Sequence, residues 1–204
     1  MGVFRIVHPG VNKSYKQFSE EIGGKYTTSG FLSGYPEVRV KSGEWTIVFD
    51  VTFTNPSCTR VRSSFLIKDG FQFAIYRKGL FSGLGELFGM RDIEVGYPEF
   101  DRNFIIKGND EAKVRTLFAN TEIRRLIDIQ PYVYLKVRDD EEFLGAAPDK
   151  VDVLYFRSIG VIRDVHRLKK LYELFGEVLN QLCLMGSASE GDPGFAIGGY
   201  ITWL

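Results

Sequence analysis

Histidine and cysteine are scarce in this chain, which has only two of each among 204 residues. Cys58 and Cys183 form no Cys-x-x-Cys pair, and neither has a histidine near it in the sequence. Thiolate-based metal sites and redox motifs need closely spaced partners, so their signatures are missing. We expect two buried free thiols rather than a disulfide, as in a protein of a reducing compartment.

Signatures of metal, nucleotide and catalytic sites are also missing. His8 and His166 have no second histidine or cysteine at metal-ligand spacing. No Gly-x-Ser-x-Gly elbow, His-Glu-x-x-His helix or P-loop occurs. The glycine-rich segment 83–89 lacks the strand-helix-strand context of a dinucleotide site, and its third glycine falls one residue late. The sequence thus predicts no metal, cofactor or catalytic residue, although a triad of distant residues stays open.

Long apolar runs are absent, since none reaches the roughly 18 residues that span a bilayer as a helix. The first ten residues have no charged segment followed by a long apolar core, so they do not resemble a secretory signal. We therefore expect no membrane span and a cytoplasmic location. The apolar tail 195–204 is predicted to be a terminal strand, with an exposed partner-binding segment as the alternative.

Neither sign of charge dominates, because Lys+Arg and Asp+Glu both total 26. No overall positive field exists to attract nucleic acid or membranes, so any charged binding surface is local. Aromatic residues are plentiful, with 17 Phe and 10 Tyr, and their burial supplies a core without disulfides or metal. No stretch has the composition of a linker, so we expect a single domain over residues 1–204.

Alternating apolar and polar residues predict strands over much of the chain. In the clearest of them, Trp45, Ile47 and Phe49 alternate with Thr46 and other residues of the opposite face. Turn residues separate this strand from its neighbours, which predicts an antiparallel meander from residue 37 to residue 77. The predicted strands are 37–41, 45–54, 58–67, 71–77, 104–107, 131–138 and 151–157.

Apolar residues spaced three and four apart predict amphipathic helices. The most regular pattern runs along a long C-terminal segment that ends at Gly186. The predicted fold class is α+β, a mainly antiparallel sheet covered on one face by this long helix and shorter helices. The predicted helix starts are Ser14, with Gln17 at capping-box spacing, Asn109 or Asp110, Thr121, and Asp164.

Basic and aromatic side chains fall on the strand faces opposite the apolar rows. If these strands share one sheet, arginines on that face could hold phosphates while tyrosine rings stack on bases. An ordinary solvated face is the alternative, and Asp50 and Asp152 would weaken its positive field. The candidate binding residues are Arg60, Arg62, Tyr132, Tyr134, Lys136 and Arg138, with Arg39, Tyr155 and Arg157 on neighbouring strands.

Acidic residues gather at two places, 92–101 and 139–142. Acid/base catalysis needs two carboxyls in different environments that face one cleft. The second group is predicted to be a solvated loop. In the first group, Asp92, Glu99 and Asp101 have arginines nearby in the sequence, so structural ion pairing and a carboxylate site around Asp92–Asp101 both stay open.

A motif with a local structural interpretation occupies residues 100–110. It reads Phe-Asp-x-x-Phe, two apolar residues and a short polar turn, and a leucine-bearing helix follows. Phe104 and Ile106 are predicted to point into the core, with Phe100 closing it. Asp101 is predicted to hydrogen-bond across the start of the strand.

This motif, together with residues 59–62 and 92–96 upstream, resembles a group of uncharacterised bacterial domains. The resemblance covers about residues 59–130. It implies a bacterial origin and carries no established activity, so it assigns no catalytic residue.

Three functions follow from these observations. The first is a non-enzymatic binding or interaction module of a bacterial cytosolic protein, because catalytic signatures are missing. The second is binding of single-stranded nucleic acid or another polyanion by the basic and aromatic sheet face. The third is an enzyme with a carboxylate site around Asp92–Asp101. The expected partner is accordingly a protein or a polyanion.

Overall fold

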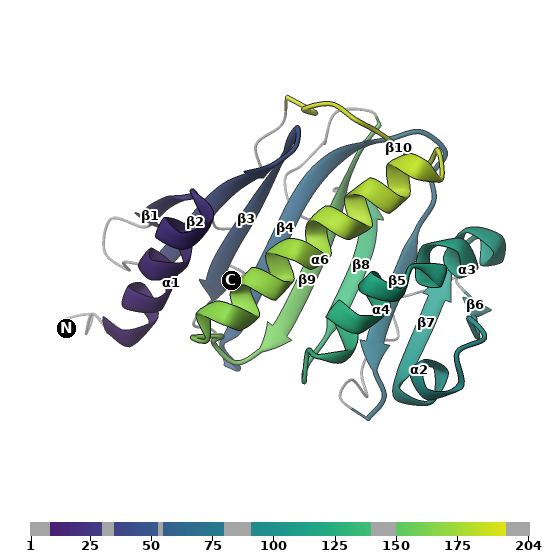
Figure 1. The fold of residues 1–204 in the computed structure, drawn as a ribbon, viewed down its shortest axis with the longest axis horizontal. Helices are drawn as coiled ribbons and strands as arrows, with labels where there is room; N and C mark the ends of the chain where they lie inside the picture. Colours follow the sequence, from purple (N-terminus) through teal and green to yellow (C-terminus); the bar gives the residue numbers. More distant parts are fainter. Residues whose placement is uncertain (1–8, 30–34, 53–54, 80–90, 140–149, 195–204) are drawn as a thin grey trace.

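The structure, a computed structural model, has helices packed against one face of a large antiparallel sheet (Figure 1). This arrangement confirms the predicted α+β class, with the long C-terminal helix running diagonally across the sheet. The structure describes residues 9–29, 35–52, 55–79, 91–139 and 150–194. The predictions for 83–89, for most of 139–142 and for 195–204 lie outside these residues.

Ten described strands form one sheet in the order β1-β2-β3-β4-β9-β8-β5-β7-β6, with β10 paired to β4. The strands are β1 (Lys25–Ser29), β2 (Tyr35–Ser42), β3 (Trp45–Thr52), β4 (Cys58–Ile67), β5 (Phe73–Arg77), β6 (Arg91–Asp92), β7 (Phe104–Gly108), β8 (Tyr134–Asp139), β9 (Val151–Ile159) and β10 (Ala188–Ser189). The helices are α1 (Pro9–Ile22), α2 (Pro98–Asn103), α3 (Glu111–Ala119), α4 (Thr121–Asp128) and α6 (Val165–Leu184).

The predicted meander is confirmed for β2, β3 and β4 but is wrong for β5. Strand β5 pairs with β8 and β7, because β9 and β8 lie between it and β4. Asp69, in the connection that follows β4, accepts hydrogen bonds from the Phe71 amide at 3.1 Å and the Ser187 hydroxyl at 3.0 Å, and pairs with Lys113. Burial raises the pKa of Asp69, but these hydrogen bonds outweigh it and hold the pKa below its ordinary value. The connection that leaves β4 is thus held by Ser187 and Lys113, which are distant in the sequence, and it does not form a hairpin between β4 and β5.

Helix α6 begins where the sequence predicts. The Asp164 carboxylate accepts hydrogen bonds from the amides of His166 at 2.9 Å and Arg167 at 3.3 Å, as an N-cap does. The apolar stripe of the helix is buried against the sheet; it consists of Leu168, Leu171, Leu174, Phe175, Val178, Leu179 and Leu182. Burying such a stripe stabilises the helix more than its intrinsic propensity does.

Two other predicted capping residues, Ser14 and Thr121, are wrong. Helix α1 begins at Pro9, so Ser14 lies inside the helix and donates its hydroxyl proton to the Gly10 carbonyl at 3.1 Å. Asn120, not Thr121, caps α4, because its side-chain oxygen accepts hydrogen bonds from two amides of the first turn at 2.9 and 3.3 Å. Both errors arise because serine, threonine and asparagine bond locally in several ways.

Aromatic rings fill the space between the helices and the sheet. The rings of Phe18 in α1 and Phe49 in β3 meet edge to face with centroids 4.7 Å apart. The rings of Phe73 in β5 and Phe118 in α3 meet in the same way at 5.8 Å. Tyr15 is fully buried, and burial raises the pKa of its phenol far above the ordinary value. The core is thus built on the aromatic content that the sequence shows.

The Phe-Asp-x-x-Phe motif has the predicted structural role. Phe104 and Ile106 are buried in the core, and the Phe100 ring lies 4.7 Å from that of Phe104. The Asp101 carboxylate accepts hydrogen bonds from the amides of Val95 and Gly96, each at 2.9 Å. The motif therefore fixes α2 against β7.

The end of β7 has no room for a side chain. A Cβ atom added at Gly108 would lie 2.5 Å from Cγ2 of Val114 in α3. Non-bonded carbon atoms prefer a separation of roughly 3.5–4 Å, so glycine lets α3 approach the sheet.

Replacing Gly108 by alanine is expected to lower the free energy of unfolding by about 1–3 kcal/mol, because overpacking forces α3 to shift. Gly10→Ala is the matched control, since nothing lies within 4 Å of its added Cβ. Urea unfolding followed by circular dichroism measures both variants. Equal stability of G108A and the parent protein would contradict the close approach of α3.

Candidate functional site

Four of the side chains predicted to bind a polyanion lie together on the sheet face away from the helices: Arg60, Arg62, Tyr134 and Lys136. Strands β4, β9 and β8 are neighbours, and the core residue Val61 alternates with Arg60 and Arg62. The predicted condition that these strands share one sheet is therefore met. The directly opposed pairs are Arg60 and Arg157, Arg157 and Tyr134, Arg62 and Tyr155, and Tyr155 and Lys136.

The arginines of β4 are buried in an ion cluster with Asp50 of β3. Arg60 donates to the two Asp50 carboxylate oxygens at 2.7 and 3.1 Å, and Arg62 donates to the same carboxylate. Only 8% of Arg60 and 2% of Arg62 and of Asp50 is exposed. Because these residues are buried, the expectation of a solvated face is wrong for them. Asp50 neutralises part of the arginines' charge inside the protein. Asp152, also expected near this face, lies opposite the core residue Phe65 on the helix side.

The predicted aromatic residues of this face are split between two environments. Tyr134 is buried in a row of rings, 6.5 Å from Tyr76 and 6.4 Å from Tyr155 between centroids. The Lys136 ammonium lies 5.5 Å from the Tyr134 ring centroid. Tyr132 precedes β8 and is 41% exposed. The backbone of Arg138 pairs with Val153, and its side chain lies outside the described part of the chain.

Burial of Arg60, Arg62 and Tyr134 does not favour binding of a polyanion to this face. Phosphate contacts need guanidinium groups that reach the surface, and base stacking needs an accessible ring face. The proposed polyanion role stays a prediction.

We expect a labelled single-stranded oligonucleotide not to bind at low salt. Fluorescence anisotropy at two salt concentrations measures this, because phosphate contacts weaken as salt rises. Salt-sensitive binding that is reduced in Lys136→Gln would contradict the expectation and would place the nucleic acid on this face.

Asp50→Asn is expected to lower the free energy of unfolding by about 3–5 kcal/mol, since it leaves two buried guanidinium groups with less compensating charge. The matched control is Asp92→Asn, because Asp92 forms an exposed 3.3 Å ion pair with Lys107 at the sheet edge. Such a pair is worth at most about 1 kcal/mol. Chemical unfolding of both variants tests the contrast, and similar losses in the two would show that the Asp50 cluster is not structural.

The carboxylates predicted as a possible acid/base site do not converge. Asp101 is held by two backbone amides, and Asp92 lies on the exposed edge strand β6. Of the three, Glu99 lines the cavity between α2 and α4, and Asp92 and Asp101 do not line that cavity. The carboxylate site around Asp92–Asp101 therefore stays a prediction, and the positions of Asp92 and Asp101 do not support it.

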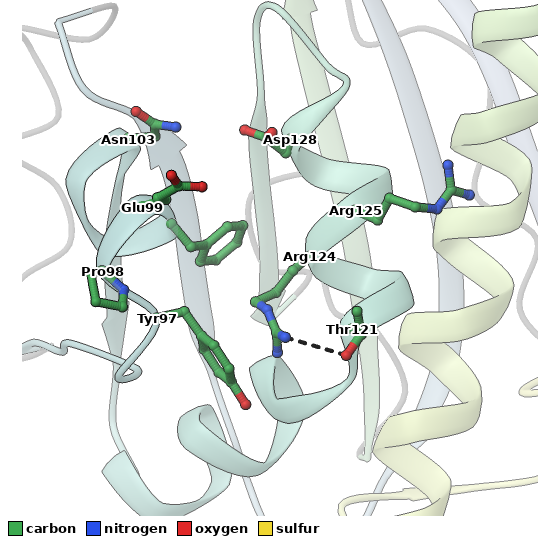
Figure 2. Close-up of a pocket in the computed structure, with 9 residues that line it drawn as sticks. Tyr97, Pro98, Glu99, Asn103, Thr121, Arg124, Arg125 and Asp128 are labelled. Atoms are coloured by element: carbon green, nitrogen blue, oxygen red, sulfur yellow. Dashed lines mark hydrogen bonds between the residues drawn. The ribbon is translucent and has the colours of Figure 1, made fainter.

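A cavity of about 410 Å³ lies between α2 and α4 (Figure 2). Figure 2 shows Glu99 and Asn103 facing Asp128 at one end, and Tyr97, Arg124 and Thr121 at the other. It is lined by Tyr97, Pro98, Glu99, Phe100, Asn103, Thr121, Arg124, Arg125 and Asp128. Only Glu99 was a sequence candidate, because the cavity forms where two helices that the sequence places separately come together.

Arg124 is fixed by its neighbours. Its guanidinium lies 3.4 Å from the ring centroid of Tyr97, a cation–π contact. It donates hydrogen bonds to the carbonyls of Phe118 and Ala119, the second at 3.0 Å, and to the Thr121 hydroxyl at 3.3 Å. These contacts tie the loop before α2 to the end of α3 and the start of α4.

Arg125 points away from the cavity toward α6 and is also engaged (Figure 2). It donates two hydrogen bonds to Glu122 at 2.7 and 2.5 Å. The hydrogen bonds from Arg125 lower the pKa of Glu122, and those to Glu122 raise the pKa of Arg125. Both cations of the lining thus have partners within the protein.

The polar side chains at the acidic end of the cavity have fewer hydrogen bonds and ion pairs within the protein than the two arginines have. Arg77 lies 3.5 Å from the Asp128 carboxylate, but the same Nη2 atom donates to the carbonyls of Asp128 at 2.8 Å and Gln130 at 3.1 Å. Within the described part of the chain, Glu99 and Asn103 form no side-chain hydrogen bond or ion pair. This end therefore offers free acceptor oxygens.

The sequence predicted neither a metal site nor a membrane-spanning helix, and the described residues bear on both predictions. In these parts of the chain, the side chains of His, Cys, Asp and Glu form no group of three that could hold a metal ion. Among the described helices, none is both long and apolar enough to span a bilayer. Cys58 and Cys183 are free, as predicted, although Cys183 is only partly buried; burial raises the pKa of the Cys183 thiol.

Comparison with known proteins identifies a shared fold. Neither a scan against models of protein families nor a search of curated proteins matches this chain. Among solved structures, it is similar to the mycobacterial trehalose monomycolate transport factor A, TtfA, with a TM-score of 0.51 and 10% sequence identity. The match covers 85% of this chain and 97% of TtfA. At this identity the likeness concerns the fold alone, and the transport role in the name belongs to TtfA.

Proposed function

We propose that this chain is a non-enzymatic interaction module of a bacterial cytosolic protein, and that it binds a protein partner at the α2–α4 cavity. The observation that carries the proposal is the cavity itself. Aromatic residues are part of its lining, the contact of Arg124 with Tyr97 fixes one wall, and the carboxylates of Glu99 and Asp128 at the other end accept no side-chain hydrogen bond from the described residues. Ligand sites are concave and combine apolar surface with a few oriented polar groups. The two free cysteines support a reducing compartment. The bacterial setting rests on the resemblance to bacterial domains.

The chemistry of the cavity favours binding over catalysis. Glu99 and Asp128 are both exposed, whereas acid/base pairs use carboxyls in contrasting environments. Thr121 accepts a hydrogen bond from Arg124, and among the described lining residues there is no histidine to activate a hydroxyl. Turnover in a broad hydrolase or transferase screen would count against this part of the proposal.

Asn103→Trp is expected to weaken partner binding about tenfold, because Asn103 is an exposed residue of the cavity lining and the larger side chain would fill the cavity. Arg102→Trp is the matched control, since Arg102 is an exposed neighbour that does not line the cavity. Cross-linking in bacterial cells followed by quantitative mass spectrometry compares the tagged parent with both variants. We expect proteins cross-linked to the parent to be recovered equally with R102W and about tenfold less with N103W, which corresponds to 1.4 kcal/mol.

Unchanged recovery with N103W would contradict a role for this cavity. A loss with both variants would point to unfolding, which circular dichroism of each variant checks.

A further inference from the structure

We infer that the α2–α4 cavity accepts a basic side chain, lysine or arginine, presented by the protein partner. The inference rests on the proposed function and specifies the chemistry of the partner. It is carried by the contrast between the two kinds of charged group in the lining. Arg124 and Arg125 donate hydrogen bonds within the protein, whereas the Glu99 carboxylate has no partner among the described residues and the Asp128 carboxylate has only a 3.5 Å ion pair with Arg77.

The acceptors at the acidic end are available for donors from outside. The Asp128 carboxylate receives no hydrogen bond from Arg77, because the two protons of the closest nitrogen, Nη2, go to main-chain carbonyls. No described group bonds to the Glu99 carboxylate. Figure 2 shows Glu99 and Asp128 on opposite walls of the same end, and both line the cavity, so a cationic group that enters this end meets acceptor oxygens from both helices.

For an anionic group, by contrast, the donors of the lining are already used within the protein. The Nη1 atom of Arg124 donates to two carbonyls, and Nη2 donates to Thr121 while the guanidinium lies on the Tyr97 ring. Arg125 is paired with Glu122 and directed away. A carboxylate or phosphate would have to compete with these bonds and would lie near the carboxylates of Glu99 and Asp128, which repel it; of the two, only Asp128 has an ion-pair partner among the described residues, Arg77.

The aromatic part of the lining suits the rest of such a side chain. Phe100 is 7% exposed and is braced by the rings of Phe104 at 4.7 Å and Phe118 at 5.8 Å. Lysine and arginine place their methylene stems on apolar surface while the charged head reaches polar partners. A cavity of about 410 Å³ is also near the lower limit of ligand sites, roughly 300 Å³, which fits one long side chain with its flanking backbone.

The test titrates three capped tripeptides into the ¹⁵N-labelled chain of residues 1–204. The peptides are acetyl-Ala-Lys-Ala-amide, the same peptide with norleucine, which lacks the ammonium, and the same peptide with glutamate. Amide chemical shifts of residues 97–103 and 121–128 report binding. We expect the lysine peptide to shift these amides and to bind at least about tenfold more tightly than either of the others.

The double variant Glu99→Gln and Asp128→Asn is expected to weaken binding of the lysine peptide by at least about tenfold. Glu94→Gln is the matched control, because Glu94 is exposed and does not line the cavity. It is expected to leave the affinity unchanged, and circular dichroism confirms that the double variant is folded.

Three results would overturn the inference. Equal affinity for the lysine and norleucine peptides would make the cavity an apolar site without charge selection. Preference for the glutamate peptide would assign the site to an anion at Arg124. No shift in α2 or α4 with any peptide would remove the basic side chain as the occupant. The recovery of partners by N103W and R102W decides the proposed function separately in each case.

Discussion

The antiparallel pairing of β4 with β9 joins the two halves of this sheet. It aligns eight residue pairs, from Thr59 opposite Ser158 to Leu66 opposite Val151. On one side of this ladder lie β1, β2 and β3, and on the other lie β8, β5, β7 and β6. Helix α6 crosses in front of it and buries its apolar stripe there (Figure 1). Because a shift of one residue would turn every side chain to the opposite face, this register also decides which groups are buried.

One consequence of the register is the buried charge on the face away from the helices. Arg60 and Arg62 lie on that face, and the pairing of β3 with β4 sets Asp50 opposite Arg60, so that the three residues form an ion cluster. Burying ions is costly, and their mutual attraction offsets that cost only when the hydrogen-bond geometry is good. The cluster therefore restricts β3 and β4 to one alignment, and it removes from the surface the charges that would otherwise attract a polyanion. The cavity between α2 and α4, at the other end of the sheet, carries the proposed function instead.

The elements with strong local patterns were predictable. The alternation around Trp45 predicted β3, the spacing of apolar residues after Asp164 predicted α6, and the Phe100 to Phe104 motif predicted the packing of α2 on β7. The neighbours of β5 were not predictable, because the connection before it is held by contacts of Asp69 with Ser187 and Lys113, which are far from it in the sequence. The cavity could not be found either, since Tyr97 and Arg124 meet only when α2 packs beside α4.

By itself, the sequence determined the α+β class, the periodic strands and helices, and that Arg60, Arg62, Tyr134 and Lys136 alternate onto the face of the sheet away from the helices. These properties follow from local backbone geometry, in which side chains repeat every two residues in a strand and every 3.6 in a helix. Only the tertiary structure decided that Arg60 and Arg62 are buried and that Glu99 and Asp128 face each other across a cavity. Burial and charge pairing depend on which distant segments become neighbours, and local periodicity carries no information about that.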